Sequence, residues 1–559
     1  MGGDEQESLS NALIRGPLEL HSLQRAVTAQ DFELIAIKQS GLVNRAHAYT
    51  KREQWQYAAP GTVEVVLVPQ VSGDQGRITP TVMLQNQNAD IAEQIQSTLA
   101  QRKPLGTQCI VSWCRYKSVK ANVCLTVHRE ENREAVKTRI LERLYDMVTP
   151  LVQSHNPSAW PFGKALGAYD IYRILTSEPG VKAVDPVVLE VSHVPNKDVT
   201  HIDADSWQHH TWYAAAGDAL YRTINNGTGW EQINQWSDEE VVCVKSFPRE
   251  NQIVAEVAGL VIALTRSPVT KENTLYLSRD CGETWSRVRK PDFIVNDVVW
   301  IERSGRPSLL IASEKGLFEQ SVVSAREWKS VVIDPDEPAL AARSVTVATN
   351  QAGTNYIAVA TPPDSGVYLS VGPHAVFKNI GLKSKIVSVL NIQYLDTQRY
   401  LWAGLSAVGD DSGQGCYRWQ LQDSGDSAEG WKPTNKNWAG GGCTALGFVD
   451  KQVYAASKRL GVMTLSWEDD LATWRPANVN CGLPMERLSQ FEVVNALAIT
   501  PSSMPDPVLL AAGPQGIYRQ VSGESTFQHC SPAHFNDRVS LPANWLFCSA
   551  DHNVTVNYD

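Results

Sequence analysis

The feature that most constrains this chain is an eight-residue motif that recurs along its second half. The best copy runs from Ser278 to Trp285, with the letters SRDCGETW, and follows a short strand-like run at 274–277. The Ser278 hydroxyl and the Asp280 carboxylate can accept hydrogen bonds from the amides of a tight turn. Gly282 can adopt the positive φ that a residue with a Cβ resists, and Trp285 can pack beneath the turn that it closes. The motif therefore predicts a β-hairpin.

Six further copies follow the same register. Thr223–Trp230 is a good copy with Asn225 and Gly227, and Ser424–Trp431 is another, with Asp426 and an alanine at the glycine position. Weaker copies keep mainly the closing aromatic residue: they end at Trp328, at Phe377, at Trp474 (with Asp469 retained) and at Phe527. The closing aromatics recur at intervals of roughly 43 to 55 residues, a range that is typical of solenoids, propellers and arrays.

The residues around each copy define the repeating unit. An apolar strand, a turn and a second strand precede most copies, as in 212–217 followed by 219–222, and another strand usually lies further upstream, as at 241–244. Four short strands per unit are typical of a propeller blade. The motif itself resembles the Asp-box of sialidase-type β-propellers, and seven copies imply seven blades over residues 200–559. The alternative is a β-sandwich with chance tryptophan spacing. For ring closure we expect the tail, including 544–548, to supply the inner strand of the first blade.

Composition narrows the class of protein. The chain has 559 residues, is 43% hydrophobic and 20% charged, and carries a net charge of -10, which gives no support to nucleic-acid binding. Its ten cysteines form no CxxC pair, which favours free thiols in a reducing, cytoplasmic compartment and indicates no zinc site. The polar, acidic start of the chain is unlike a secretion signal, and no run of 18 apolar residues occurs.

Residues 1–199 differ in kind from the repeats. A segment at 1–24 with a short helix at 5–14 is followed by alternating helix and strand patterns over 25–195. We expect a capped helix after Thr28, a strand at 63–68, a helix carrying Ile91, Ile95 and Leu99, and a half-buried strand at 119–127. Helices at 136–148 and 166–175 and strands at 181–184 and 187–192 complete the pattern. The class is α+β.

Several short sequence motifs of this region, in their order and spacing, resemble the baseplate J family of contractile phage tails and related injection systems. They include 25–33, 61–69, Arg102 with Pro104, Leu105 and Gly106, the strand at 119–127, Trp160-Pro161-Phe162-Gly163 and 171–181. Two of these motifs, 102–106 and 160–163, are predicted to be turns flanked by apolar residues. Such turns suit either a contact with a partner or an internal corner of the core.

The resemblance implies a structural role. The chain would be an α+β baseplate-wedge domain followed by an all-β seven-bladed β-propeller, within an assembled phage tail-like particle in the cytoplasm. Its partners would be other wedge and hub proteins, and the propeller would contact a fibre, a cargo or a membrane anchor. Relatives usually carry a longer upstream segment and no propeller. Either a separate chain supplies that upstream half or this wedge does without it, and the mode of dimerisation stays open.

No constellation of catalytic residues emerges. A sialidase needs an arginine cluster, a Tyr–Glu pair and an acid, and a glycosidase needs two opposed carboxylates. Asp280 and Asp426 lie inside boxes, where a turn explains them. His201, Asp203 and Asp205, with His209 and His210, are interpreted as a solvated domain junction rather than a metal site. We therefore expect no enzyme activity, cofactor or metal. Two alternatives stay open: a carbohydrate-active propeller on the particle, and a free assembly factor that uses the propeller as a docking platform.

Overall fold

The chain folds into two compact units, Met1–His193 with Ala533–Asp559 and Val194–Pro532. The computed structural model describes residues 25–559 except 72–77, 153–158, 192–193, 196, 228, 250–256, 289, 304, 323–327, 351–352, 373–375, 396–397, 409–411, 423–429, 467–471, 477–481, 489, 501–506, 522–525, 531–533 and 536–537. The expected N-terminal helix at 5–14 lies outside the described residues. None of the helices among these residues is long and apolar enough to span a bilayer.

The first unit begins with a small sheet covered by two helices. Strand β2 pairs antiparallel with β1 and parallel with β3, and helices α2 and α5 pack on this sheet. Thr28 and Asp31 form the expected capping box at the start of α2. Ile91, Ile95 and Leu99 of α5 are buried in the core, as their spacing predicts. The elements are α2 (Ala29–Gln39), β1 (Val43–Thr50), α3 (Lys51–Gln54), β2 (Thr62–Pro69), α4 (Pro80–Gln85), α5 (Ala89–Arg102) and β3 (Gln108–Trp113).

A second sheet of this unit is built on one long strand, β4 (Arg115–Val127), whose side chains alternate between buried and half-buried from Val119 onward. The antiparallel strands β6 (Val181–Val184) and β7 (Val188–Val191) pair with it. The remaining elements of this part are α6 (Arg133–Met147), β5 (Leu166–Gly167) and α7 (Ala168–Thr176). The helices and strands expected over 119–192 are therefore present, with boundaries shifted by a few residues.

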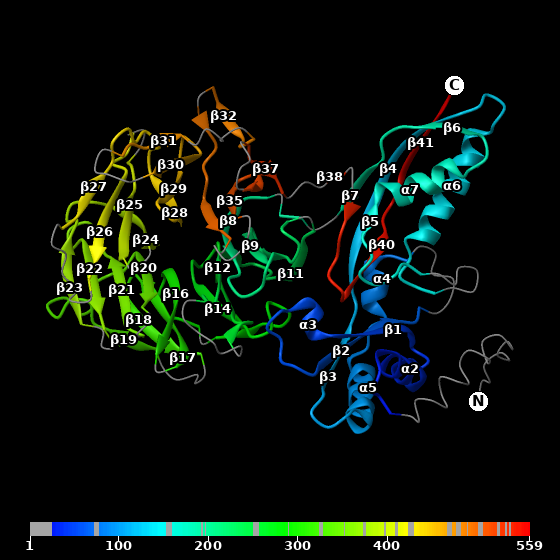
Figure 1. Cartoon of the computed structure of the whole chain (residues 1–559), viewed down its shortest axis with the longest axis horizontal. Helices are drawn as coiled ribbons and strands as arrows, with labels where there is room; N and C mark the ends of the chain where they lie inside the picture. Colours follow the sequence, from blue (N-terminus) through cyan, green and yellow to red (C-terminus); the bar gives the residue numbers. More distant parts are fainter. Residues whose placement is uncertain are drawn as a thin grey trace. The chain divides into compact units, whose positions relative to one another are not determined.

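The C-terminal tail completes this same sheet. Strands β40 (Trp545–Ser549) and β41 (Asn553–Tyr558) pair in parallel with β4, and the short strands β38 (His534–Phe535) and β39 (Arg538–Val539) pair with β7 and β5. Figure 1 shows β40 and β41, in red, beside the cyan β4. The expectation that 544–548 closes the propeller is therefore wrong, and so is the domain end at 559. Because all five residues of β40 are buried, their apolar pattern suits any interior sheet.

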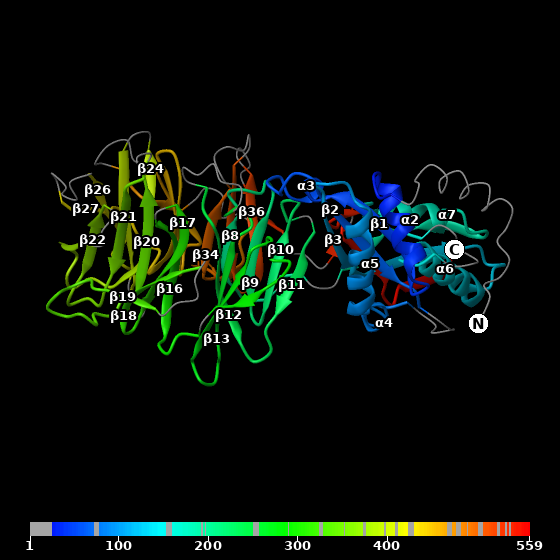
Figure 2. The same cartoon turned by 90° about the horizontal axis from the view of Figure 1, so that it is seen from below.

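The second unit is mostly β, as expected, and consists of four-stranded antiparallel sheets. Within the described residues there are seven of them, each formed by strands consecutive in the sequence (Figure 1). In Figure 2, β20 and β21 of one sheet lie side by side. The sheets are β8 (Val199–Ala204), β9 (Trp212–Ala216), β10 (Ala219–Thr223), β11 (Glu231–Gln235); β12 (Glu240–Ser246), β13 (Val261–Arg266), β14 (Asn273–Ser278), β15 (Ser286–Arg287); β16 (Val295–Arg303), β17 (Arg306–Ser313), β18 (Gly316–Ser321), β19 (Lys329–Val331); β20 (Ser344–Thr349), β21 (Asn355–Ala360), β22 (Val367–Val371), β23 (Phe377–Gly381); β24 (Val387–Leu395), β25 (Gln398–Leu405), β26 (Cys416–Leu421), β27 (Lys432–Thr434); β28 (Cys443–Val449), β29 (Gln452–Ser457), β30 (Val462–Ser466), β31 (Arg475–Pro476); and β34 (Ala496–Ile499), β35 (Val508–Gly513), β36 (Gly516–Val521), β37 (Gln528–His529). A two-stranded hairpin, β32 (Met485–Arg487) and β33 (Gln490–Phe491), precedes the last sheet.

The first strands of the seven sheets contact one another in a closed cycle. The order is β8, β12, β16, β20, β24, β28, β34 and back to β8, so each sheet is one blade of a ring. The first blade takes its inner strand from β8, at its own N-terminal end. No strand from the far end of the chain is needed to complete a blade.

Side chains on the inner strands hold neighbouring blades together. In four blades a register shift turns the second residue of the inner strand out of the pairing pattern, and that residue donates a hydrogen bond to a carbonyl at the start of the next blade. The link from the last blade to the first comes from Asn495, whose Nδ2 lies 3.0 Å from the Val199 carbonyl oxygen. The four bonds are Thr200 to Val241 (2.9 Å), Asn296 to Ala342 (2.8 Å), Ser388 to Cys443 (2.6 Å) and Thr444 to Val494 (2.5 Å).

The recurring motif lies between the third and fourth strands of the blades. In the second blade, Ser278 Oγ accepts from the Gly282 amide at 2.8 Å, and Asp280 Oδ1 accepts from the Thr284 amide at 2.9 Å. In the first blade, Thr223 Oγ1 and Asn225 Oδ1 accept from the amides of Gly227 (3.0 Å) and Gly229 (2.8 Å) in the same way. The closing aromatics Trp230, Trp285, Trp328, Phe377, Trp431, Trp474 and Phe527 all stand directly before, or at the start of, the outermost strand of their blade.

The motif also joins neighbouring blades. Arg222 of the first blade donates to the carbonyl of Cys281, the fourth residue of the next box, at 2.7 Å. Arg519 of the last blade occupies the same place in its repeat and donates to the carbonyl of Asn226, the fourth residue of the first box, at 3.1 Å. The Trp230 indole of the first blade donates to the Cys530 carbonyl of the last at 2.8 Å. The repeat therefore supplies contacts within and between blades.

The glycine at the fifth box position is under a double constraint, which gives a first prediction. Gly227 has φ +81°, and a Cβ there would lie 2.9 Å from the ring of the buried Trp212. Gly217 of the same blade has φ +60° with nothing within 4 Å of such a Cβ. We expect Gly217→Ala to cost the ~1–2 kcal/mol of a left-handed residue, and Gly227→Ala to cost at least ~1 kcal/mol more because the ring must shift. Urea unfolding midpoints of the two variants test this, and equal losses would contradict it.

Candidate functional site

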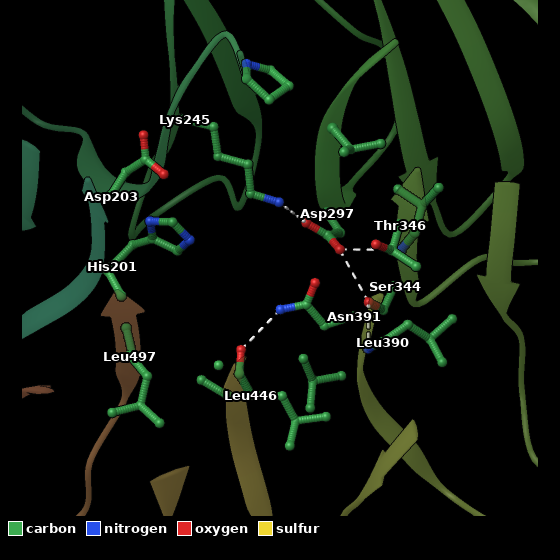
Figure 3. A pocket seen from close by; sticks show the side chains of 18 of the residues that line it. His201, Asp203, Lys245, Asp297, Ser344, Thr346, Leu390, Asn391, Leu446 and Leu497 are labelled. Carbon is green, nitrogen blue, oxygen red and sulfur yellow. Dashed lines mark hydrogen bonds and ion pairs between the residues drawn. The ribbon is translucent and has the colours of Figure 1, made fainter. Parts of the chain in front are cut away.

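The inner strands of the propeller surround a cavity of about 610 Å³. Residues from the inner strand of every blade line it, and Figure 3 shows the side chains that project into it. Consecutive residues of the inner strands line it, for example 201–204 and 344–347. This cavity is the candidate functional site, since it collects polar and apolar side chains from segments that are far apart in the sequence.

One side of the cavity holds a hydrogen-bonded ion pair. The Lys245 ammonium of β12 lies 3.1 Å from Asp297 Oδ1 of β16 and donates to the Val298 carbonyl at 2.7 Å. The other oxygen, Asp297 Oδ2, accepts from the Ser344 hydroxyl and the Val345 amide, both at 3.1 Å. Burial alone would lower the pKa of Lys245, but the adjacent Asp297 raises it above the ordinary value. The ammonium is therefore charged and fixed in place across three blades.

Asp203 and His201 of β8 stand beside this ion pair (Figure 3). Asp203 Oδ2 accepts two hydrogen bonds from Ser246, from the amide at 2.7 Å and from the hydroxyl at 2.5 Å. Burial raises the pKa of Asp203 to about 6, although the Ser246 bonds and Lys245 act in the opposite direction. Burial lowers the pKa of His201 to about 3, and Lys245 lowers it further, so the imidazole is neutral near neutral pH.

Apolar side chains form another part of the cavity wall. Leu390, Leu446 and Leu497 come from the inner strands of three consecutive blades and appear together in Figure 3. Asn391 lies among them, but its amide donates to the Leu446 carbonyl at 2.8 Å and accepts from the Ile392 amide at 2.9 Å. Its polar groups are thus occupied by the backbone. The charged lining residues thus come from blades one to four, whereas blades five to seven contribute leucines together with Ser388, Thr444 and Asn495.

The described part of the chain contains no cluster of three or more His, Cys, Asp or Glu side chains suited to a metal ion. The expectation that His201, Asp203 and Asp205 lie in a solvated junction is wrong. They belong to the first blade: residues 199–204 form its inner strand, and Asp205 is buried, accepting from the amides of Trp207 and Gln208 at 2.8 and 3.1 Å. His209 and His210, in the following turn, are exposed.

The box residues singled out from the sequence lie away from the cavity. Among the described residues no box residue lines it, since the boxes join the third and fourth strands and the cavity is bounded by the first. The Asp280 carboxylate is used within its own turn. Ser424 and Asp426 of the third good copy, and Asp469 of a weaker copy, lie outside the described residues.

The two turn motifs of the first unit, 102–106 and 160–163, occupy different environments. Arg102 ends α5, and Pro104, Leu105 and Gly106 form the turn before β3, with Gly106 at φ +85° and Leu105 fully exposed. The Leu105 side chain therefore presents an apolar group to solvent.

The second turn motif, residues 160–163, forms a packed corner. Trp160 is buried, and its indole donates to the Lys164 carbonyl at 3.0 Å. Phe162 stacks on His47 with ring centroids 4.9 Å apart, and the Arg45 guanidinium lies over the same ring at 4.6 Å. Pro161 is exposed, and Gly163 has φ +67°. The motif at 160–163 is therefore an internal corner of the core, unlike the exposed turn at Leu105.

Sequence reasoning missed the cavity residues Lys245, Asp297 and Ser344. One signal in the sequence could have found them. When the repeats are aligned by their boxes, each of these polar residues falls in the first strand of its repeat. Lys245 and Asp297 both fall within these strands. Their pairing across blades depends on ring geometry, which local patterns do not contain.

Comparison with known proteins finds propellers of low similarity. No protein-family profile matches the chain, and no curated protein matches it in sequence. Similar solved structures include a GH74 xyloglucanase from Xanthomonas campestris (15% identity, TM-score 0.44), covering 62% of this chain and 56% of the enzyme. This chain thus spans little more than half the length of that protein. Others are YCF48 bound to D1 peptide (12%, TM-score 0.38, 59% and 94% coverage) and a mitotic checkpoint complex chain (12%, TM-score 0.40, 60% and 90%). These likenesses concern the fold alone.

Proposed function

We propose that the chain is a structural wedge component of the baseplate of a contractile injection system, and that its propeller is a binding module. The first unit would contact the other wedge and hub proteins. The propeller would contact a fibre, a cargo or a membrane anchor. The particle would assemble in the cytoplasm, and we assign no reaction to the chain.

The observation that carries this proposal is that the propeller is inserted into the first unit. The chain leaves that unit after 193 and returns at 533 to add β40 and β41 to the sheet of β4. Two chain connections make the propeller a built-in part of the scaffold unit's chain, which suits a component of a larger assembly. All the motifs that resemble the baseplate J family lie in the scaffold unit, from 25–33 through 171–181.

Two further features support a role in contacts rather than catalysis. The carboxylate of the best box, Asp280, bonds within its turn, so the residue that suggests a sialidase is explained by the fold. Leu105 is fully exposed on a turn in which Gly106 has a positive φ, so its apolar side chain is available for burial against a neighbouring subunit.

Fractionation of cells that produce the full chain tests the proposal. We expect the protein to sediment with sheathed particles, and Leu105→Glu to reduce the particle-bound fraction severalfold because a buried charge opposes assembly. Val269→Glu is the matched control, since Val269 is also exposed, at 86%, but lies in the propeller. Wild-type protein found only in light fractions would overturn the proposal and favour a free assembly factor. Equal loss in both variants would exclude the Leu105 turn as the contact.

A further inference from the structure

Asp205 follows the inner strand of the first blade and carries a buried carboxyl group with only one bonded oxygen. The residue is 3% exposed, and its Oδ1 accepts from the amides of Trp207 and Gln208 at 2.8 and 3.1 Å. Its Oδ2 is buried and, within the described part of the chain, has no hydrogen-bond partner. An ionised carboxylate in a protein interior needs donors on both oxygens or an adjacent cation, because it has lost its hydration. The missing donor to Oδ2 therefore makes the charged form costly.

The titratable groups that face Asp205 supply no positive charge. Asp203, two residues earlier in the chain, adds negative charge. The Tyr213 hydroxyl of β9 and the Cys281 thiol of the next box also face it, and both are neutral because burial raises the pKa of each well above its ordinary value. The two histidines of the turn that follows are exposed to solvent. Among the described residues, Asp205 therefore has no counter-ion.

Two cations lie in this part of the propeller, and both are held by other carboxylates. Lys245 is paired with Asp297 at 3.1 Å. Arg222 is bonded to Glu231 and Glu283, each at 2.9 Å. Neither cation is left to balance a charge on the carboxyl group that follows the inner strand.

In these surroundings the neutral acid is the favoured form of Asp205. Burial raises its pKa to about 7; the amides of Trp207 and Gln208 act in the opposite direction, and Asp203 raises it again. The neutral group keeps both amide bonds, since Oδ1 remains an acceptor when the proton is on Oδ2. Protonation therefore removes the uncompensated charge without breaking a bond that the structure shows.

Tyr213 connects this carboxyl group to the next blade, because its hydroxyl donates to the Cys281 carbonyl at 3.2 Å. A negative charge on Asp205 would attract the same hydroxyl, since a carboxylate is a stronger acceptor than a carbonyl, and would weaken that bond between the blades. We propose that Asp205 is a pH-sensitive joint: the folded propeller holds it as a neutral acid, and its ionisation at higher pH loosens the first blade from the second. This inference does not depend on the proposed assembly role, because every residue in it belongs to the propeller.

The direction of the pH dependence follows from the two states of the chain. In the unfolded chain an Asp carboxyl group has an ordinary pKa of about 3.9, so above about pH 4 unfolding releases a proton that the folded chain keeps. Because the folded pKa is raised to about 7, the contribution of Asp205 to the free energy of unfolding falls as the pH rises from about 4 to about 7 and is constant above that. An amide at this position is neutral at every pH and removes the dependence.

Urea unfolding of the full chain, followed by tryptophan fluorescence, tests the proposal with Asp205→Asn. The amide keeps an oxygen for the bonds from Trp207 and Gln208 and replaces the acid O–H with an N–H. We expect the folded-to-unfolded ratio of Asp205→Asn, relative to the wild type, to rise at least about tenfold between about pH 4.5 and about pH 7.5. Asp336→Asn is the matched control: Asp336 is an exposed carboxylate of the same propeller, and we expect its ratio to stay within about twofold of the wild type at both pH values. A relative ratio for Asp205→Asn that stays constant or falls with pH, or an equal rise in Asp336→Asn, would overturn the proposal.

The infrared spectrum of the wild-type chain gives a second reading, which stays decisive if Asp205→Asn fails to fold. Protonated carboxyl groups absorb separately from carboxylates, and at about pH 6.5 exposed Asp and Glu side chains are ionised. We expect a protonated-carboxyl band at this pH that disappears as the pH rises to about 8.5 and is largely absent from folded Asp205→Asn. A wild-type spectrum without that band, or an undiminished band in the folded variant, would show that Asp205 is ionised and contradict the proposal.

Discussion

Replacing Arg222 with methionine is expected to destabilise the propeller by about 3–5 kcal/mol, the cost of removing one member of a buried ion pair. The Arg222 side chain is fully buried, and its guanidinium lies 2.9 Å from Glu231 of its own blade and 2.9 Å from Glu283 of the next. Methionine fills a similar volume but leaves both carboxylates without their cation. Burial lowers the pKa of Arg222, yet the two carboxylates more than offset this, so the side chain is charged at every accessible pH. The free energy of unfolding, from urea titration of the full chain, measures the loss.

Arg519→Met is the matched control for this prediction. Arg519 stands at the same place in its repeat and makes the same bond to the carbonyl of the fourth box residue, at 3.1 Å. Unlike Arg222, it forms no ion pair with a carboxylate among the described residues. We expect a loss of about 1–2 kcal/mol there, the range for a single hydrogen bond to a charged group. Adding Glu231→Gln to Arg222→Met should recover part of the loss, since it removes one uncompensated charge. Equal losses in the two single variants would contradict the role of the carboxylates.

The regular part of the second unit could be predicted because its signals are local. The hydroxyl and carboxylate of Ser278 and Asp280, and the left-handed glycine after them, act within a single box. Regular repetition of that hairpin then predicts the number of sheets, even where a copy keeps only its aromatic residue. In the first unit, the capping box of Thr28 and the apolar helix face that ends at Leu99 could be predicted for the same reason, because each depends only on residues that are close in the sequence.

Ring closure could not be predicted for a physical reason. Thr200 and Ser388 look like ordinary strand residues, and their role depends on a register shift and on the carbonyl of the next blade. The Lys245–Asp297 pair likewise joins two blades 52 residues apart. Such contacts belong to the tertiary arrangement, in which the inner strands are brought around one axis. The polar run at His201 resembles a junction because an inward-facing strand in a wet cavity has the composition of a loop.

The error at the C-terminus has the same origin. An apolar strand at 545–549 contains no information on which interior sheet it joins, and its parallel partner β4 lies near the opposite end of the sequence. The consequence is functional, because a tail that completes the scaffold makes the propeller an insertion, whereas a tail that closes the ring would make it a terminal appendage. The two arrangements differ in what a single buried substitution in β40 would destabilise.

Phe547→Ala is therefore expected to destabilise the first unit by about 3–5 kcal/mol while leaving the propeller unchanged, since it removes a large side chain from a packed core. Phe547 is 1% exposed, pairs through its backbone with Lys117 of β4, and meets the Trp160 ring edge-on at 6.3 Å. Hydrogen exchange on the full chain reports the two units separately, because the amides of β4 and α6 belong to one and those of β9 and β21 to the other. We expect faster exchange only in the first pair.

Tyr558→Ala provides the control for this last prediction, because Tyr558 lies on the neighbouring strand β41 but is 46% exposed and contacts the Arg133 guanidinium at 4.3 Å. Loss of an exposed cation–π contact should cost no more than about 1 kcal/mol and leave the exchange of β4 close to that of the wild type. If Phe547→Ala instead accelerated exchange in β9 or β21, the tail would stabilise the ring, and the propeller would not be an independent insertion. If exchange in both units changed together, the two would unfold as one cooperative body, and the scaffold and the binding module could not be treated as separate parts of the assembly.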